Sequence, residues 1–155
     1  MRAILRDLAL DRSPAFYRDG QFLAALAAGL LFWLFLFRTT ADVHSIGGTL
    51  GIALSLCLMQ PLIEELIFRG VVQGELLRHI WGSKKWLGIS AANAATSSAF
   101  MALHFLSHPP LWALSVMIPS LLFGHFRERH NSLYPPLALH IYYNTGYFLT
   151  TGFPI

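Results

Sequence analysis

The chain has 155 residues, of which 55% are hydrophobic and only 12% are charged. Soluble domains carry roughly 25% charged residues on average. The composition therefore excludes a disordered chain, and the single Cys57 excludes a disulfide scaffold. A membrane protein or an exceptionally apolar small domain remains, and at ~20 residues per span the length allows about five membrane helices.

Five apolar runs follow one another along the chain and predict five membrane-spanning helices. They cover residues 22–37, 46–63, 86–106, 111–126 and 134–153. Pro119 is expected to bend the fourth helix. Because no small-residue cleavage pattern follows the first run, we expect a retained helix rather than a signal peptide. The predicted fold is all-α, a polytopic transmembrane helix bundle of about five spans forming a single integral-membrane domain over residues 1–155.

The basic residues are distributed unequally among the predicted loops. Nine of the eleven lie before the first run or in the second-to-third and fourth-to-fifth connections. Only Arg38 lies on the opposite side, and Arg69 lies among apolar residues. Because Lys and Arg are retained on the cytoplasmic face, we expect the N-terminus inside and the C-terminus outside. The basic residues form loop clusters rather than a stripe with stacking aromatics, so the pI near 9.4 does not indicate a nucleic-acid partner.

The segment 60–72 places three charges, Glu64, Glu65 and Arg69, inside an apolar stretch. Each costs roughly 2.5–3.5 kcal/mol at a membrane-helix centre unless it pairs or faces a cavity. Glu65 and Arg69 are four apart and can pair on one face, whereas Glu64 points away from Arg69, as expected for a candidate general base. Pro61 is expected to kink the helix just before the acids. The alternative is that the segment is the cytoplasmic end of the second helix, where carboxylates meet water.

Two further pairs of residues lie four apart on later predicted helices. Phe100 and His104 share a face of the third helix, and His140 and Asn144 share a face of the fifth. Taken alone, His104 is more simply explained as an imidazole near a helix end that contacts a backbone carbonyl or a headgroup. His140 and Asn144 would serve equally well as polar contacts between helices. The small residues over 91–99 predict close helix packing.

Together, the three motifs resemble the CaaX protease and bacteriocin-processing family of glutamate-dependent intramembrane endopeptidases, which are related to the Ras-converting CaaX endopeptidase. The motifs in chain order are Glu64-Glu65-x-x-x-Arg69, Phe100-x-x-x-His104 and His140-x-x-x-Asn144. Each falls on a separate predicted helix. The resemblance covers 48–147, which we expect to be the catalytic core.

The resemblance implies a role for each motif residue. Glu64 would act with His104 to activate a water that attacks the scissile carbonyl of a membrane-anchored protein or peptide. The supporting pair would be Glu65 and Arg69, and the donors to the oxyanion would be His140 and Asn144. No cofactor and no metal are expected. The short chain is similar to a minimal bacterial member, which favours the bacterial plasma membrane and a dedicated substrate, such as a C-terminal sorting tail, over prenyl processing.

A depth count along the predicted spans separates Glu64 from His104. If the second span starts at residue 46, Glu64 lies ~27 Å along it, near the cytoplasmic face. His104 would then lie near the outer face. Either the second span begins later, or the turn at 107–110 is sunk into the protein.

Three other functions are compatible with the sequence. Two histidines and two carboxylates would suit zinc, although Glu64 and Glu65 diverge on the helix and Arg69 is a poor neighbour for a cation. A non-catalytic scaffold or bacteriocin-immunity protein would keep its function without Glu64 and His104. A small transporter would use Glu64 as a proton relay, but five helices without internal repeats do not fit the usual transporter architecture.

Overall fold

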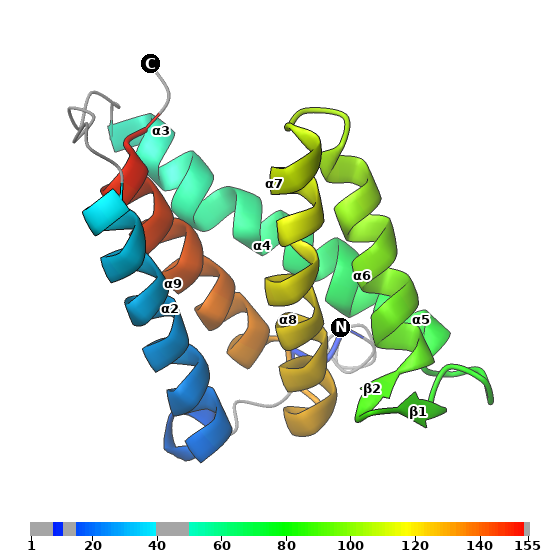
Figure 1. The fold of residues 1–155 in the computed structure, drawn as a ribbon. Helices are drawn as coiled ribbons and strands as arrows, with labels where there is room; N and C mark the ends of the chain where they lie inside the picture. Colours follow the sequence, from blue (N-terminus) through cyan, green and yellow to red (C-terminus); the bar gives the residue numbers. More distant parts are fainter. Residues whose placement is uncertain (1–7, 11–14, 40–49, 154–155) are drawn as a thin grey trace. The chain divides into compact units, whose positions relative to one another are not determined.

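The computed structural model describes residues 8–10, 15–39 and 50–153, and these are mostly helical (Figure 1). They pack as two compact units. The first comprises Met1–Pro14 and Glu64–Pro136, and the second comprises Ala15–Ile63 and Leu137–Ile155. The all-α class is confirmed in outline, while the single domain over 1–155 stays a prediction. The predicted start of the second span at residue 46 lies outside the described residues.

Two helices in the described part of the chain are long and apolar enough to cross a membrane, Gly20–Thr39 and Leu50–Leu76. The first is α2, which follows a short 3₁₀ turn, η1, at Phe16–Arg18. Most of the large apolar side chains of α2 are exposed, as expected for a surface that faces lipid. The total of about five spans stays a prediction.

The second long helix alternates between α and π turns. Its parts are α3 (Leu50–Leu54), η2 (Ser55–Met59), α4 (Gln60–Glu65), η3 (Leu66–Val72) and α5 (Gln73–Leu76). The first π turn ends at Met59, two residues before Pro61, whose ring would clash with a carbonyl four residues earlier in a regular α-helix. The irregularity expected at Pro61 is thus present as a widened turn before it.

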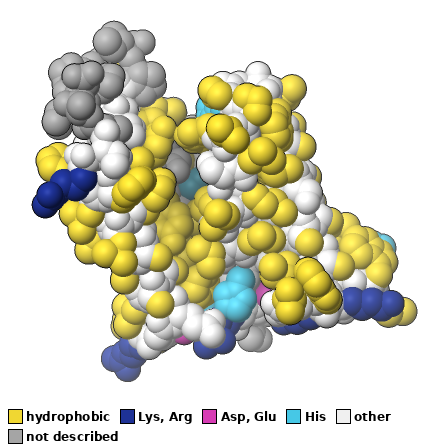
Figure 2. Space-filling view, in the orientation of Figure 1, with side chains coloured by type: hydrophobic (Ala, Val, Ile, Leu, Met, Phe, Trp, Pro, Cys, Tyr) yellow, Lys and Arg dark blue, Asp and Glu magenta, His cyan; other side chains and the backbone are white. Residues whose placement is uncertain are grey.

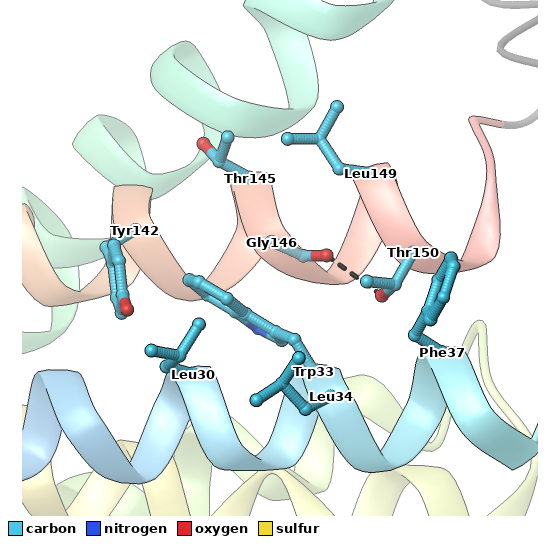
Figure 3. Close-up of a pocket in the computed structure, with 9 residues that line it drawn as sticks. All are labelled: Leu30, Trp33, Leu34, Phe37, Tyr142, Thr145, Gly146, Leu149 and Thr150. Atoms are coloured by element: carbon cyan, nitrogen blue, oxygen red, sulfur yellow. Dashed lines mark hydrogen bonds between the residues drawn. The ribbon is translucent and has the colours of Figure 1, made fainter.

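In the second unit, α2 packs against α9 (Tyr134–Thr151), whose bounds agree closely with the predicted fifth helix. The hydroxyls of Tyr142 and Tyr143 donate to the carbonyls of Leu26 and Ala25, at 3.0 and 2.9 Å. Beside these contacts, α2 and α9 leave an apolar cavity of about 400 Å³. Figure 3 shows the Trp33 ring beside Gly146 in this cavity, where a Cβ on the glycine would lie 1.9 Å from the ring.

The first unit contains three helices and one hairpin after the long helix. Strands β1 (Lys85–Trp86) and β2 (Ile89–Ser90) pair antiparallel, and α6 then runs over Ala91–His104. The predicted start of the third helix at Trp86 is therefore wrong. Ser90 is the N-cap instead, because its Oγ accepts the backbone N–H of Asn93 at 2.9 Å.

The predicted fourth helix, 111–126, is two helices, α7 (Pro110–Ser115) and α8 (Met117–His130). Pro119 has no N–H to donate to the carbonyl of Ser115, and the first helix ends at that residue. The bend expected at Pro119 is thus a break one turn earlier. Helix α8 also continues through Arg127 to His130, which the sequence placed in a loop.

Close packing joins α6 to α8, as the small residues over 91–99 predict. The Nδ2 of Asn93 donates to the Leu121 carbonyl at 3.0 Å, and the Ser97 hydroxyl donates to Oδ1 of Asn93 at 3.1 Å. A Cβ at Gly124 would lie 1.9 Å from that same Oδ1. The two backbones approach this closely because small residues face each other.

Candidate active site

The centre of the first unit is a buried ion pair between two predicted site residues. Arg69 is 0% exposed and Glu65 is 1% exposed, and the Nη1 of Arg69 lies 3.5 Å from Oε1 of Glu65. The pairing predicted from their spacing of four residues is therefore present. Burial removes both groups from water, so the pair requires further polar contacts to be stable.

Helix α8 supplies those contacts through Ser120. The Nη2 of Arg69 donates to the Ser120 carbonyl at 2.8 Å and to its Oγ at 2.6 Å. Two rings also flank the guanidinium, with its carbon 5.0 Å from the Phe100 centroid and 5.5 Å from that of Phe123. Such cation–π contacts gain strength in a site without water. Arg69 therefore anchors the long helix to both α6 and α8.

The backbone at Arg69 is held by a second arginine. Gln73 donates its N–H to the carbonyl of Phe68, five residues back, and the chain then returns to α geometry. That return leaves the Arg69 carbonyl without its usual backbone donor. The Nε of Arg127 donates to it at 3.2 Å. Arg127 thus stabilises the widened turn that carries the Glu65–Arg69 pair.

Glu64 lies near the middle of the long helix. It is ~21 Å from Leu50 and ~18 Å from Leu76 along the axis, at the usual rise of 1.5 Å per residue. The helix therefore does not end at the charges, and the alternative in which both acids meet water at its end is wrong for the buried Glu65. Glu64 itself is half-buried, so the two adjacent carboxylates have different surroundings.

Phe100 connects the first two motifs within the first unit. Its ring packs edge-on against Phe68 at 5.0 Å and lies 4.4 Å from the ring of His104. Since the guanidinium of Arg69 also lies over the Phe100 ring, the ion pair and the histidine both contact this one side chain. The first two motifs therefore meet at Phe100, and the relative depth of Glu64 and His104 stays a prediction.

The tautomer of His104 follows from its hydrogen bond. Nδ1 lies 2.8 Å from the carbonyl oxygen of Phe100, which can only accept, so Nδ1 carries the hydrogen. Nε2 is then the nitrogen that can take up a proton. The ring is also stacked at 29° on Trp112, with the centroids 5.7 Å apart. Nearby His108 has a pKa lowered by burial and by the charge of His104.

The third motif belongs to the second unit. His140 is buried and Asn144 is half-buried, both on α9. The Nδ2 of Asn144 donates to the carbonyl of Leu56 at 3.0 Å. In the π register, where Gln60 donates to Ser55, the next donor to Leu56 would be residue 61, and proline has no N–H. Asn144 supplies the missing donor.

The structure thus brings the first two motifs together, with Glu65, Arg69, Phe100 and His104 joined in the first unit. That His140 and Asn144 form one site with those residues stays a prediction. Sequence reasoning missed Ser120, Phe123 and Arg127, which all lie on α8 and complete the surroundings of Arg69. A polar residue directly after Pro119 in an apolar helix was the available signal for Ser120.

Comparison with known families identifies the family to which the chain belongs. A family model described as type II CAAX prenyl endopeptidase Rce1-like matches residues 46–146, roughly two thirds of the chain. The chain belongs to the Rce1-like family. This is a family of membrane-embedded proteases, which implies a protein substrate in a membrane context. Neither the curated proteins nor the solved structures gave a match.

All six predicted site residues of this Rce1-like chain lie inside the matched range. The resemblance drawn from the three motifs is therefore confirmed at the level of the family. The individual roles of the six residues stay predictions.

Proposed function

We propose that this Rce1-like chain is an intramembrane glutamic-type endopeptidase that cleaves a membrane-associated protein near its terminus. The observation that carries the proposal is the division between the two adjacent acids. Glu65 is buried and paired with Arg69, whereas Glu64, one residue earlier in α4, is half-buried. A base that activates water must be reachable by water, and a residue that holds the site need not be.

In this mechanism Glu64 and His104 share the activation of one water. Glu64 accepts a proton from the water, whose oxygen forms a bond to the scissile carbonyl carbon. The C–N bond then breaks, and the proton passes to the leaving nitrogen. His104 suits a role beside the carboxylate, because its Nδ1 hydrogen is held by Phe100 and Nε2 is the free lone pair.

His140 and Asn144 are proposed as donors to the oxyanion of the tetrahedral intermediate, on the strength of the resemblance. Donors aimed at a developing negative charge act strongly in a site with little water. The amide of Asn144 has two hydrogens, and the Leu56 carbonyl takes one of them. The second hydrogen is the one that this role requires.

The membrane orientation is proposed from the basic residues. In the first unit, the turn after α5, the strand β1 and the end of α8 carry Arg78, Lys85 and Arg127 in that order, and Lys85 lies 3.9 Å from Glu128. This end of the unit would face the cytoplasm of a bacterial cell, because cytoplasmic loops retain positive charge. Reporter fusions at each terminus test the orientation, and an outside N-terminus would contradict it.

Substrate cleavage provides the decisive test. The substrates are membrane-anchored proteins that end in a C-terminal sorting tail or a CaaX-like sequence, followed by mass spectrometry of their termini. Glu64→Gln and His104→Gln are expected to abolish cleavage with little loss of folded protein. Glu75→Gln is the matched control, because Glu75 lies on the same helix and forms an exposed pair with Arg78. Undiminished cleavage by Glu64→Gln would refute the mechanism and favour a non-catalytic scaffold.

A further inference from the structure

The end of the first unit that carries the β-hairpin exposes large apolar side chains beside basic ones (Figure 2). Ile80, Trp86 and Leu87 are 90%, 78% and 80% exposed. We call this patch the hairpin surface; it consists of Arg78, Ile80, Trp81, Lys84, Lys85, Trp86 and Leu87. Tryptophan and lysine together are typical of the boundary between headgroups and acyl chains.

The backbone at the tip of the hairpin has positive φ angles at a residue with a large side chain. Leu87 and Gly88 form the two-residue turn, with φ of 49° and 85°. Such a turn usually has Asn-Gly, because a bulky residue is disfavoured in the left-handed region. Here a leucine occupies that position and is 80% exposed. Leu87 therefore has a strained backbone conformation, and its apolar side chain is exposed at the tip of the hairpin.

A groove of about 390 Å³ opens beside the hairpin surface. Lys84 and Lys85 lie at one end, and the apolar walls come from α6 and α8. The small side chains of Ala91 and Ala94 leave the space open. On α8 the groove is lined by Met117 and Leu121, which lie one turn apart, ~6 Å along the helix axis.

The charge at the mouth of the groove is positive. Glu128 lies 3.9 Å from Lys85, but its carboxylate also accepts hydrogen bonds from Gln73 and Ser90. Among the residues that the structure describes, Lys84 has no ion pair. A mouth with an uncompensated lysine and an apolar channel behind it matches a molecule with an anionic head and a hydrocarbon tail.

We propose that the hairpin surface and its groove bind an anionic phospholipid. The phosphate lies at Lys84 and Lys85, and one acyl chain lies along the groove between α6 and α8. Trp86 and Leu87 enter the boundary between headgroups and acyl chains. The proposal does not depend on peptide-bond hydrolysis, since none of these residues belongs to the proposed active site.

The charge requirement is tested with the purified full-length chain in detergent. Phosphatidylglycerol and phosphatidylcholine with identical acyl chains are titrated, and bound lipid is counted by native mass spectrometry. The wild-type chain is expected to prefer phosphatidylglycerol. The double variant Lys84→Gln/Lys85→Gln is expected to bind it about 5- to 30-fold more weakly, and Lys84→Arg/Lys85→Arg to keep the preference. Equal binding of both lipids by the wild type, or an unchanged preference in the glutamine variant, would overturn the proposal.

The tip residue allows a second test in which stability and binding move in opposite directions. Leu87→Asn is expected to raise the melting temperature in detergent, because asparagine tolerates the left-handed turn, and to weaken phosphatidylglycerol binding. Leu106→Asn is the matched control, since Leu106 is 82% exposed in the turn after α6. It is expected to leave lipid binding unchanged. A Leu87→Asn chain that binds phosphatidylglycerol as the wild type does would remove the hairpin tip from the site.

Discussion

The two adjacent carboxylates allow a direct test of the division between structural and chemical roles. Glu65→Gln removes the charge that lies 3.5 Å from Nη1 of Arg69, in a pair that is at most 1% exposed. Glu64→Gln makes the same chemical change one residue earlier, at a half-buried position. The two variants are therefore matched in size, polarity and place in the sequence.

The loss of unfolding free energy expected for Glu65→Gln follows from the surroundings of Arg69. At 3.5 Å and an effective dielectric constant of about 20, two unit charges attract by roughly 5 kcal/mol. Breaking a buried pair from one side costs about 3–5 kcal/mol, because a charge is left buried. Arg69 keeps its two contacts with Ser120 and its two flanking rings, so we expect the lower value, about 3 kcal/mol, for Glu65→Gln. For Glu64→Gln we expect less than about 1 kcal/mol.

Thermal unfolding in detergent, followed by tryptophan fluorescence, measures the difference. Glu65→Gln is expected to lower the melting temperature by about 6–12 °C, at roughly 2–4 °C per kcal/mol for a chain of this size. Glu64→Gln is expected to unfold near the wild-type temperature while losing cleavage. If Glu64→Gln destabilised the chain as strongly as Glu65→Gln, or Glu65→Gln cost nothing, the assignment of the two roles would fail.

Three further predictions follow from the packing and the chemistry. Gly124→Ala is expected to cost about 1–3 kcal/mol in unfolding experiments, because its Cβ would overlap Oδ1 of Asn93; unchanged stability would mean that α6 and α8 are farther apart. Asn144→Leu is expected to cost about 1–3 kcal/mol by leaving the Leu56 carbonyl unsatisfied, and to cost less in a Pro61→Ala background, where residue 61 regains an N–H; strict additivity would contradict this. Cleavage is expected to survive exhaustive chelation, and its loss, restored by added zinc, would establish the zinc-dependent alternative.

Helices were predicted correctly where the apolar runs were long and uninterrupted. Helix bounds were predicted wrongly where a turn itself consisted of apolar residues. All four ends of α2 and α9 lie within two residues of the predicted bounds. Residues 86–90 of the hairpin were predicted as helix because the turn is Leu87-Gly88, which lacks the usual Asn-Gly signal. The break before Met117 followed from Pro119, but a proline alone does not show which neighbouring residue ends the helix.

Within the candidate site, contacts along one helix were predictable and contacts between helices were not. A spacing of four residues sufficed to pair Glu65 with Arg69, since a helix fixes that geometry. Ser120 and Phe123 contact the same arginine from α8, at a separation of about fifty residues. No periodicity in the sequence specifies which face of α8 meets Arg69, so this part of the site required the packed structure.

The two π turns of the long helix share one physical property that bears on how mutations are interpreted. Each leaves a backbone carbonyl without its usual donor, and a side chain from another helix supplies the donor. Arg127 donates to Arg69 in the first unit, and Asn144 donates to Leu56 in the second. A widened turn is costly in a medium without water unless these groups are satisfied.

Asn144 consequently has a structural contact that is independent of catalysis. Loss of cleavage in an Asn144 variant would not by itself place this residue at the oxyanion, because the same change removes support for the turn before Pro61. The two roles separate when stability and rate are measured together. Asn144→Leu in the Pro61→Ala background recovers the missing backbone donor but no side-chain amide. If the variant regains the melting temperature but keeps a low activity, with kcat reduced more than KM is raised, the amide acts on the reaction. If activity returns together with stability, the role of Asn144 is structural.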